Sequence, residues 1–333
     1  MLKLQDIRRL HIELTTRCNA RCPMCMRNYR GMTYNSGYPL TELTLDQIRH
    51  ILPPDFLAQI KHINLNGNLG DFGLATDAAE IVTYFLKYSE AHIQIETNAS
   101  MRSPDWWARL ADPRTRILFA LDGLADVHDL YRQDTDWHRI VANAQAFIQA
   151  GGRAVWKFIP FDHNRHQIQQ CRDLSQQLGF EQFIIRDHGR NQGPVFDRDG
   201  SFSHWLGEPG KERPDAKVML HDHVTWFKPD GRFPWIKDQN CDIHCISKQD
   251  REIYLAADGS VYPCCFLGFY PSTMQHPGNE QFRDWTSKNN ALDWDLATCI
   301  EWFAQVESSW RAESIKDGRL YTCVQSCGSV SKR

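Results

Sequence analysis

The segment that decides the fold runs from residue 10 to residue 25 and reads LHIELTTRCNARCPMC. Its first five residues form a mostly apolar run that predicts a β-strand, and Cys18, Cys22 and Cys25 follow it closely. Further runs of this kind predict five more strands, at 60–65, 92–96, 116–121, 154–159 and 183–186. Helical stretches separate these runs. The alternation predicts parallel βαβ units, in either an open doubly wound sheet or a barrel.

Local signals mark where the intervening helices begin and end. Residues 44–47 form a capping box, residues 77–80 resemble one, and Ser103 precedes Pro104 at a first helical position. Gly151 and Gly179 stand where helix ends need a residue that tolerates positive φ. Near the C-terminus, an apolar stripe predicts one helix over 299–310, and Asp258-Gly259 predicts the turn of a short hairpin.

Composition excludes several classes of protein. The chain has 333 residues, of which 42% are hydrophobic and 24% charged, as in ordinary globular proteins. Its 38 Lys and Arg against 41 Asp and Glu give a net charge of −3, so we expect neither a nucleic-acid nor a membrane partner. The N-terminus lacks a signal peptide and no long apolar run occurs, which predicts a cytoplasmic protein.

Eleven cysteines are distributed unevenly along the chain. A secreted disulfide framework would be short and would not usually leave an odd cysteine, so clustered thiolates indicate metal or iron–sulfur ligands. The three thiolates of the N-terminal loop can hold three irons of a [4Fe–4S] cube and leave the fourth iron open. The alternative is a structural zinc knuckle, which normally closes with four ligands.

A C-x3-C-x2-C motif after a first strand, followed by repeated βα units, resembles the radical S-adenosylmethionine (radical SAM) superfamily. The resemblance implies a partial (β/α)6 TIM-like barrel over residues 1–190, with a [4Fe–4S] cluster bound by Cys18, Cys22 and Cys25 and chelated by S-adenosylmethionine. It also implies further cofactor-binding positions, which are Met24, Gly67, Asn68, Asp71, Thr97, Asn98, Asp122 and Arg132. For Arg132 we weigh a pairing with the methionyl carboxylate against a surface helix charge.

After a linker or excursion over 191–240, residues 241–333 resemble the SPASM/twitch auxiliary-cluster extension, a small domain with a short hairpin and a helix. The resemblance implies one auxiliary [4Fe–4S] cluster bound by Cys245, Cys264, Cys323 and Cys327. Cys241 and Cys265 are rivals, either as additional ligands or as thiols that handle radicals. A zinc site drawn from Cys241, His244, Cys245 and Cys264 is a further alternative. Cys171 and Cys299 lie on apolar helical stripes and are expected to be core thiols.

The resemblance implies an oxidoreductase or maturase that cleaves S-adenosylmethionine reductively and abstracts hydrogen through a 5′-deoxyadenosyl radical. The first hypothesis for its substrate is a peptide or peptide-like molecule that is oxidised, cross-linked or epimerised. The second is a small polar metabolite, such as an aminosugar or nucleoside, acted on by a dehydrogenase, epimerase or decarboxylase. A non-catalytic iron–sulfur or zinc protein is the third. An external one-electron donor such as a flavodoxin or ferredoxin is the expected redox partner.

Overall fold

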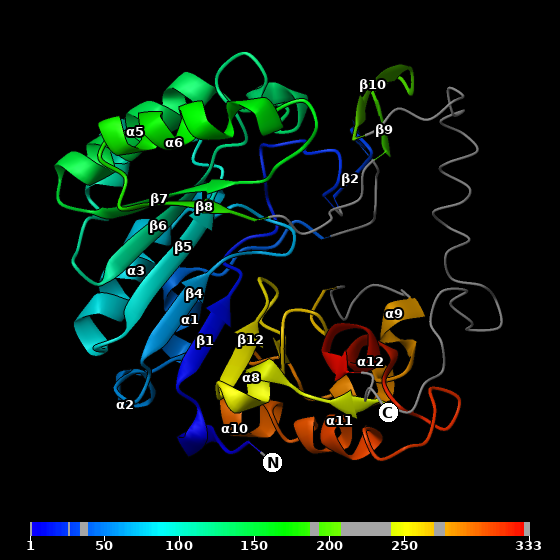
Figure 1. Cartoon of the computed structure of the whole chain (residues 1–333). Helices are drawn as coiled ribbons and strands as arrows, with labels where there is room; N and C mark the ends of the chain where they lie inside the picture. The colour runs from blue at the N-terminus through cyan, green and yellow to red at the C-terminus, as the bar shows by residue number, and fades with distance from the viewer. Residues whose placement is uncertain are drawn as a thin grey trace.

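One sheet of eight strands runs through both halves of the chain (Figure 1). The computed structural model describes residues 2–25, 27–33, 39–186, 193–207, 241–269 and 277–329. The strand order is β13-β12-β1-β4-β5-β6-β7-β8. Six of these strands belong to the predicted barrel and pair in parallel: β1 (Arg9–Ile12), β4 (His62–Leu65), β5 (His92–Thr97), β6 (Thr115–Ala120), β7 (Arg153–Phe158) and β8 (Gln182–Ile185). The predicted partial (β/α)6 barrel is therefore confirmed.

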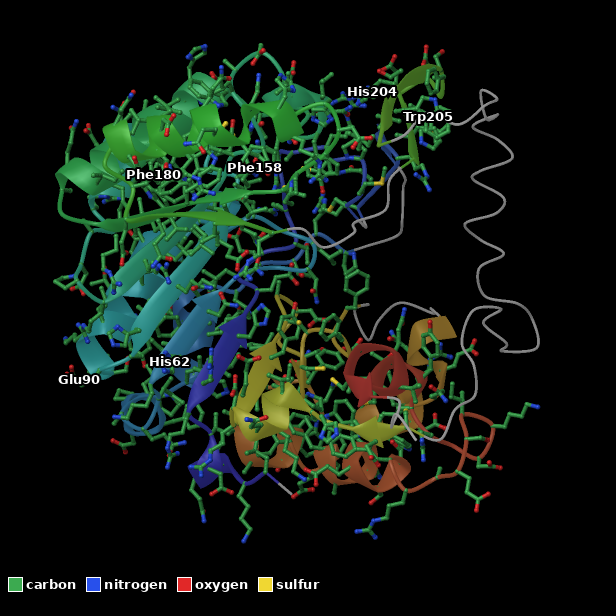
Figure 2. The ribbon with its side chains drawn as sticks, in the orientation of Figure 1. His62, Glu90, Phe158, Phe180, His204 and Trp205 are labelled. Atoms are coloured by element: carbon green, nitrogen blue, oxygen red, sulfur yellow. The ribbon has the colours of Figure 1, made fainter. Side chains whose placement is uncertain are left out.

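Helices cover one face of this sheet and complete its main core. The α-helices of the barrel are α1 (Leu45–Ile51), α2 (Pro54–Leu57), α3 (Ala78–Tyr88), α4 (Pro104–Ala108), α5 (Trp137–Gln149) and α6 (Ile168–Gln177). Short 3-10 turns are η1 (Leu4–Asp6), η2 (Phe72–Leu74), η3 (His128–Leu130) and η4 (Arg165–Gln167). Phe158 of β7 and Phe180, which follows α6, lie between the sheet and the helices (Figure 2). Cys171 is fully buried in this core, as expected.

Helices begin after all three predicted start signals, and at two of them the predicted residue caps the helix with its side chain. Thr44 forms a complete capping box with Gln47, and the Ser103 hydroxyl accepts a hydrogen bond from the Trp106 backbone N–H. Asp77 also precedes its helix, but its side chain does not cap it. The Asp77 carboxylate instead accepts the Leu45 backbone N–H of α1 at 2.8 Å, because α1 and α3 pack side by side.

The hairpin of the C-terminal region adds two strands to the barrel sheet. Its strands are β12 (Glu252–Leu255) and β13 (Val261–Tyr262), which pair antiparallel. Gly259 turns the hairpin with a φ of +87°, a conformation that favours glycine. Strand β12 then pairs in parallel with β1, so that residues far apart in sequence share one rigid sheet. The sequence predicted the hairpin but not where it docks.

The excursion after the barrel begins with a second hairpin. Strands β9 (Gly193–Phe196) and β10 (Phe202–Leu206) pair antiparallel, and a small ribbon of β2 (Asn28–Tyr29) and β3 (Met32–Thr33) lies nearby. The Phe196 backbone N–H donates to the Arg30 carbonyl at 2.8 Å. His204, which Figure 2 labels beside Trp205, lies with Nε2 at 3.0 Å from the Leu130 carbonyl. Residues 191–192 and 208–240 of the expected linker lie outside the described residues.

Short helices complete the C-terminal region. They are α8 (Ile246–Gln249), α9 (Pro277–Glu280), η5 (Arg283–Thr286), α10 (Leu296–Cys299), α11 (Phe303–Ser309) and α12 (Tyr321–Cys327), with β11 (Asp242–Ile243) paired to β14 (Gly328–Ser329). The single helix predicted over 299–310 is wrong, because the segment divides into α10 and α11. Cys299 is nevertheless fully buried. Within the described part of the chain, no helix has the length and apolar character needed to span a membrane.

Candidate active site

The three N-terminal cysteines share one loop beyond the carboxyl end of β1. The Cys25 backbone N–H donates to the Cys22 carbonyl at 3.0 Å, and the Asn28 N–H donates to the Cys25 carbonyl at 2.9 Å. These turns fold the loop back on itself. Cys22 is buried, and Cys18 and Cys25 are partly exposed. We call residues 18–25 the cysteine loop.

A separate apolar cluster supports the cysteine loop. It joins Cys22 and Ala20 to side chains from the loops after β6 and β7 and from the β9–β10 hairpin; its remaining buried members are Tyr131, Ile159, Phe161, Val195 and Leu206. Met24, Cys18 and Cys25 pack against this cluster from its edge. The hairpin after the barrel is therefore a structural support of the cysteine loop.

The environment of these thiols opposes their ionisation. Burial raises the pKa of Cys22 to about 11, although the nearby Arg132 guanidinium acts in the opposite direction. Burial also raises the pKa of Cys18, and the charge of Asp71 adds to the effect. Both free thiols are therefore protonated at neutral pH. A metal centre that bound here would have to displace those protons, as thiolate ligation generally does.

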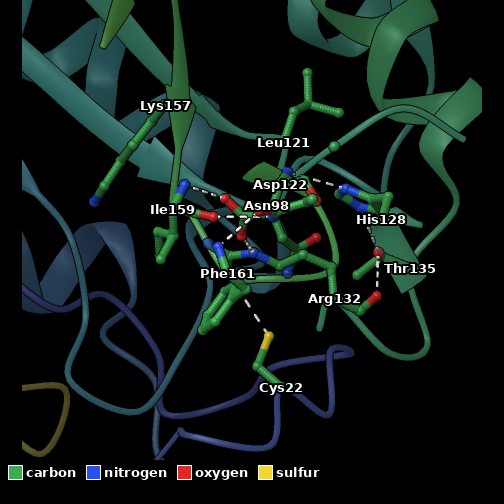
Figure 3. Close-up of polar contacts among 12 residues, drawn as sticks. Cys22, Asn98, Leu121, Asp122, His128, Arg132, Thr135, Lys157, Ile159 and Phe161 are labelled. Carbon is green, nitrogen blue, oxygen red and sulfur yellow. Dashed lines mark hydrogen bonds and ion pairs between the residues drawn. The ribbon is translucent and has the colours of Figure 1, made fainter. Parts of the chain in front are cut away.

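Arg132 lies beside the cysteine loop (Figure 3). Its Nη1 is 3.8 Å from the Cys22 sulfur, and its Nε forms an ion pair with the Asp122 carboxylate at 2.6 Å. The Arg132 side chain is only 15% exposed, and that of Asp122 is fully buried. The alternative that Arg132 is a surface helix charge is therefore wrong. The sequence predicted both residues but not their pairing.

The segments around Asp122 hold its carboxylate in place. The Ile159 backbone N–H donates to Asp122 Oδ1 at 2.6 Å, and Asn164 Nδ2 donates to the Asp122 carbonyl at 3.1 Å. The Asp122 N–H donates to His128 Nδ1 at 3.2 Å (Figure 3). Burial lowers the pKa of His128 to about 3, so its imidazole is neutral and can accept this bond. Sequence analysis missed His128 and Asn164 as supports of the site.

Asp71, Thr97 and Asn98 form a second buried group at the ends of β4 and β5. Thr97 Oγ1 donates to Asp71 Oδ1 at 2.8 Å, and the Asn98 N–H donates to Asp71 Oδ2 at 2.7 Å. Burial raises the pKa of Asp71, and these donors oppose the shift. Asn98 Nδ2 lies 3.8 Å from the Cys18 sulfur. Asn98 is thus the member of this group that reaches the cysteine loop, while Asp71 and Thr97 fix its position.

The turn over residues 66–71 packs directly against the segment that leads into the cysteine loop. A Cβ on Gly70 would lie 1.6 Å from the Thr15 carbonyl oxygen, so only glycine fits this approach. The Asp71 N–H donates to the Arg17 carbonyl at 2.8 Å. Of the predicted residues in the turn, Gly67 lies against the Glu13 carboxylate, and Asn68 donates its side-chain amide to the Cys265 carbonyl of the C-terminal region.

Glu13 holds the turn and was missed by sequence analysis. Its Oε1 accepts the backbone N–H groups of Leu69 and Gly70 at 2.7 and 2.8 Å, and its Oε2 accepts the Tyr254 hydroxyl at 2.8 Å. Burial raises the pKa of Glu13, while all three donors lower it. A charged residue inside an otherwise apolar strand run was the signal that could have revealed it.

Charged side chains also line the face of the sheet opposite the helices. Lys157 of β7 forms an ion pair with Glu96 of β5 across the intervening strand β6. His11 of β1 lies with Nε2 at 2.8 Å from the Asn66 carbonyl and interacts electrostatically with Glu96. Polar and charged side chains therefore occupy part of this face, beside the buried apolar Leu118 and Val155.

The four cysteines predicted for the auxiliary site line one pocket. Cys245 precedes α8, Cys264 lies in the loop after β13, and Cys323 and Cys327 are one helical turn apart on α12. The rest of the pocket wall is mostly apolar and includes Phe266, Leu267, Phe303, Val306 and Trp310. Burial raises the pKa of Cys323 to about 12, and the neighbouring Cys245 and Cys327 thiols add to it.

Cys241 and Cys265 lie outside this pocket lining. Arg319 Nη1 donates to the Cys241 carbonyl at 3.1 Å, and the Cys241 sulfur lies against Gly328. A zinc ion would hold sulfur ligands at about 2.3 Å. In the described ranges no three Cys, His, Asp or Glu side chains converge closely enough for one metal ion.

Comparison with known proteins agrees with this geometry. Among solved structures, SuiB of Streptococcus suis aligns with a TM-score of 0.56 at 13% identity, over 95% of this chain and 72% of SuiB. SuiB bound to S-adenosylmethionine gives a TM-score of 0.52 at 13% identity, over 95% of this chain and 77% of that one. A histidine-tagged form of anSMEcpe with bound AdoMet gives 0.51 at 15% identity, over 89% of this chain and 77% of that one. At these identities the likeness shows a shared fold.

Sequence comparison identifies the domain. No curated protein matches the chain significantly. Residues 12–172 match the model of the Radical SAM superfamily. That range begins within β1 and includes the cysteine loop, the turn at 66–71 and the Asp122–Arg132 pair. The chain therefore contains a domain of the radical SAM superfamily, which spans residues 12–172.

Proposed function

We propose that the chain is a radical SAM enzyme that binds a [4Fe–4S] cluster through Cys18, Cys22 and Cys25 and modifies a peptide by hydrogen abstraction. The observation that carries the proposal is the set of three thiols on one loop at the carboxyl edge of a parallel sheet, which is where barrel enzymes place their active sites. When bound together, such a cluster and S-adenosylmethionine supply a 5′-deoxyadenosyl radical.

The residues present fit this pair of cofactors. Three soft thiol donors suit iron, and no fourth cysteine of the described chain joins their loop, so one iron stays open to S-adenosylmethionine. Gly70 brings the turn at 66–71 against the segment before the cysteine loop. The Arg132 guanidinium next to Cys22 supplies positive charge where thiolates and a carboxylate would gather.

Each of the neighbouring residues has a role in this proposal. The turn at 66–71, with Gly67, Asn68 and Asp71, presents backbone groups to the amino group of S-adenosylmethionine. Thr97 and Asn98 lie on the ribose side, and Met24 packs near the adenine. Arg132, oriented by Asp122, faces the methionyl carboxylate. The apolar cluster around Tyr131 and Phe161 excludes water from the cysteine loop.

A second [4Fe–4S] cluster bound by Cys245, Cys264, Cys323 and Cys327 completes the proposal. Its support is the single pocket that these four thiols line and that Cys241 and Cys265 do not. A peptide substrate is supported by the shared fold with SuiB, which has been solved bound to its precursor peptide SuiA. We expect the electron to come from a cytoplasmic donor such as a flavodoxin or ferredoxin.

The test is anaerobic reconstitution followed by reduction with S-adenosylmethionine present. We expect about eight irons per chain, four for each cubic cluster, and release of 5′-deoxyadenosine. Replacing Cys18, Cys22 and Cys25 together by Ala should remove about half of the iron and all of the 5′-deoxyadenosine. Full iron loading of that triple variant, or no 5′-deoxyadenosine from a fully loaded wild type, would refute the proposal. Deuterium transfer from labelled peptides or free metabolites then identifies the substrate.

A further inference from the structure

The turn at 66–71 is held from its far side by the C-terminal region. Asn68 Nδ2 donates to the Cys265 carbonyl at 2.9 Å, to the Tyr254 hydroxyl at 3.2 Å and to the Gly268 carbonyl at 3.3 Å. The two carbonyls belong to the loop over residues 264–268, which begins with Cys264. One side-chain amide thus ties the turn to a loop that carries a proposed auxiliary ligand.

Tyr254 closes the same network from β12. Its ring is fully buried, and its hydroxyl donates to Glu13 Oε2 while accepting from Asn68. Glu13 Oε1 in turn accepts the Leu69 and Gly70 backbone N–H groups. A continuous path of hydrogen bonds therefore runs from the 264–268 loop through Asn68, Tyr254 and Glu13 and back to the turn.

Close packing leaves the path little freedom to rearrange. A Cβ on Gly268 would lie 2.5 Å from the Tyr254 ring, and a Cβ on Gly67 would lie 2.4 Å from Glu13 Oε1. The Glu13 backbone N–H also donates to the Leu255 carbonyl at 2.9 Å, which ties β1 to β12 at this level (Figure 1). A displacement of the 264–268 loop must therefore move Asn68, Tyr254 or both.

We propose that Asn68 and Tyr254 are positioning residues that couple the auxiliary site to S-adenosylmethionine binding. This inference rests on the proposed function. A cluster bound to Cys264 fixes the start of the 264–268 loop, and the loop carbonyls then hold the turn in its binding conformation. The turn is then ordered before S-adenosylmethionine binds. Because binding loses less conformational entropy, the affinity for S-adenosylmethionine rises. Linkage requires the converse as well: bound S-adenosylmethionine strengthens retention of the auxiliary cluster.

The test compares S-adenosylmethionine affinity with and without the auxiliary cluster in two backgrounds. Cys323→Ala removes an auxiliary ligand outside the 264–268 loop, and iron analysis verifies the loss. The dissociation constant is measured anaerobically by equilibrium dialysis for the wild type, Cys323→Ala, Asn68→Ala and the double variant. Tyr254→Phe keeps the buried ring and replaces Asn68→Ala if that variant fails to fold. Tyr84→Phe is the matched control, since it also deletes a buried hydroxyl hydrogen bond, to the Leu52 carbonyl at 2.9 Å.

We expect Cys323→Ala to weaken binding at least about fivefold in the wild-type background, a typical size for coupling between sites. In the Asn68→Ala background the same change should alter the dissociation constant less than about twofold, and Tyr84→Phe should preserve the full effect. Equal weakening in both backgrounds, or none in the wild type, overturns the coupling but leaves the proposed function standing. A wild type that binds no S-adenosylmethionine or holds no second cluster overturns both.

Discussion

The buried ion pair between Arg132 and Asp122 gives the sharpest prediction for stability. Arg132→Met keeps most of the apolar stem, but it removes the guanidinium, which lies over the Tyr131 ring and is the cation beside the Asp122 carboxylate. That carboxylate has no solvent exposure, and within the described part of the chain the donor that it retains is the Ile159 N–H at 2.6 Å. Breaking a buried pair by removing one partner costs about 3–5 kcal/mol, because an uncompensated charge stays buried.

Asp122→Asn should lower the free energy of unfolding less than Arg132→Met does. The amide keeps the shape of the side chain and can still accept the Ile159 N–H, so we expect a loss of about 1–3 kcal/mol. Combining Arg132→Met with Asp122→Asn removes both charges, and the double variant should be more stable than Arg132→Met alone. The two single effects should therefore be non-additive by roughly 0.5–3 kcal/mol.

Urea denaturation of the cluster-free chain at pH 7, under reducing conditions, measures these free energies of unfolding. Arg153→Met provides the control, because Arg153 pairs with Glu181 at 2.9 Å at the surface, where the side chains are 42% and 36% exposed. Such an exposed pair contributes about 0–1 kcal/mol. If Arg132→Met costs no more than Arg153→Met, or if the Arg132 and Asp122 effects simply add, the argument for a buried and coupled pair fails.

Three further predictions use other parts of the site. Cys264→Ala should lower the iron content to about half, whereas Cys265→Ala should leave it near eight per chain; an equal loss in both would place Cys265 among the ligands. His128, whose pKa burial lowers to about 3 from 6.5, stays neutral in the folded chain while the unfolded chain binds a proton, so stability falls as the pH drops below about 6.5. In urea titrations His128→Gln should remove about 1.4 kcal/mol per pH unit of that slope between about pH 6 and 4, and an unchanged slope would contradict the assignment. Leu206→Ala should cost about 2–5 kcal/mol because Leu206 is fully buried, while the exposed Ser203→Ala should stay within about 0.5 kcal/mol.

The barrel could be predicted from the sequence because its signals are local. Each of the six predicted strand runs overlaps a strand in the structure, and Thr44 and Ser103 cap the helices that they precede. Spacing of apolar residues and caps involves neighbours within a few positions, which a single sequence records directly. The cysteine loop was equally visible, since its three thiols lie within eight residues.

Many contacts that support the site could not be predicted, because they join residues far apart in the chain. Asp77 has the sequence of a cap, yet its carboxylate bonds to α1, 32 residues away. Glu13 and Tyr254 are 241 residues apart and meet only because β12 pairs with β1. Asn68 could be placed in the turn, but the direction of its amide is set by the 264–268 loop. The periodicity of apolar residues along the chain carries no information about which distant residues come into contact.

The pairing of β12 with β1 also changes how the two groups of cysteines are related. A separate auxiliary domain on a linker would let its cluster move relative to the cysteine loop. Here Arg9 to Ile12 are in register with Glu252 to Leu255, and Glu13 continues the contact through its backbone and its carboxylate. Any strain at the auxiliary pocket is therefore transmitted through a sheet and a buried hydrogen-bond path rather than absorbed by a flexible connection. The hairpin is thus part of the structure that holds the turn at 66–71, and it leads directly into the 264–268 loop that contacts the same turn.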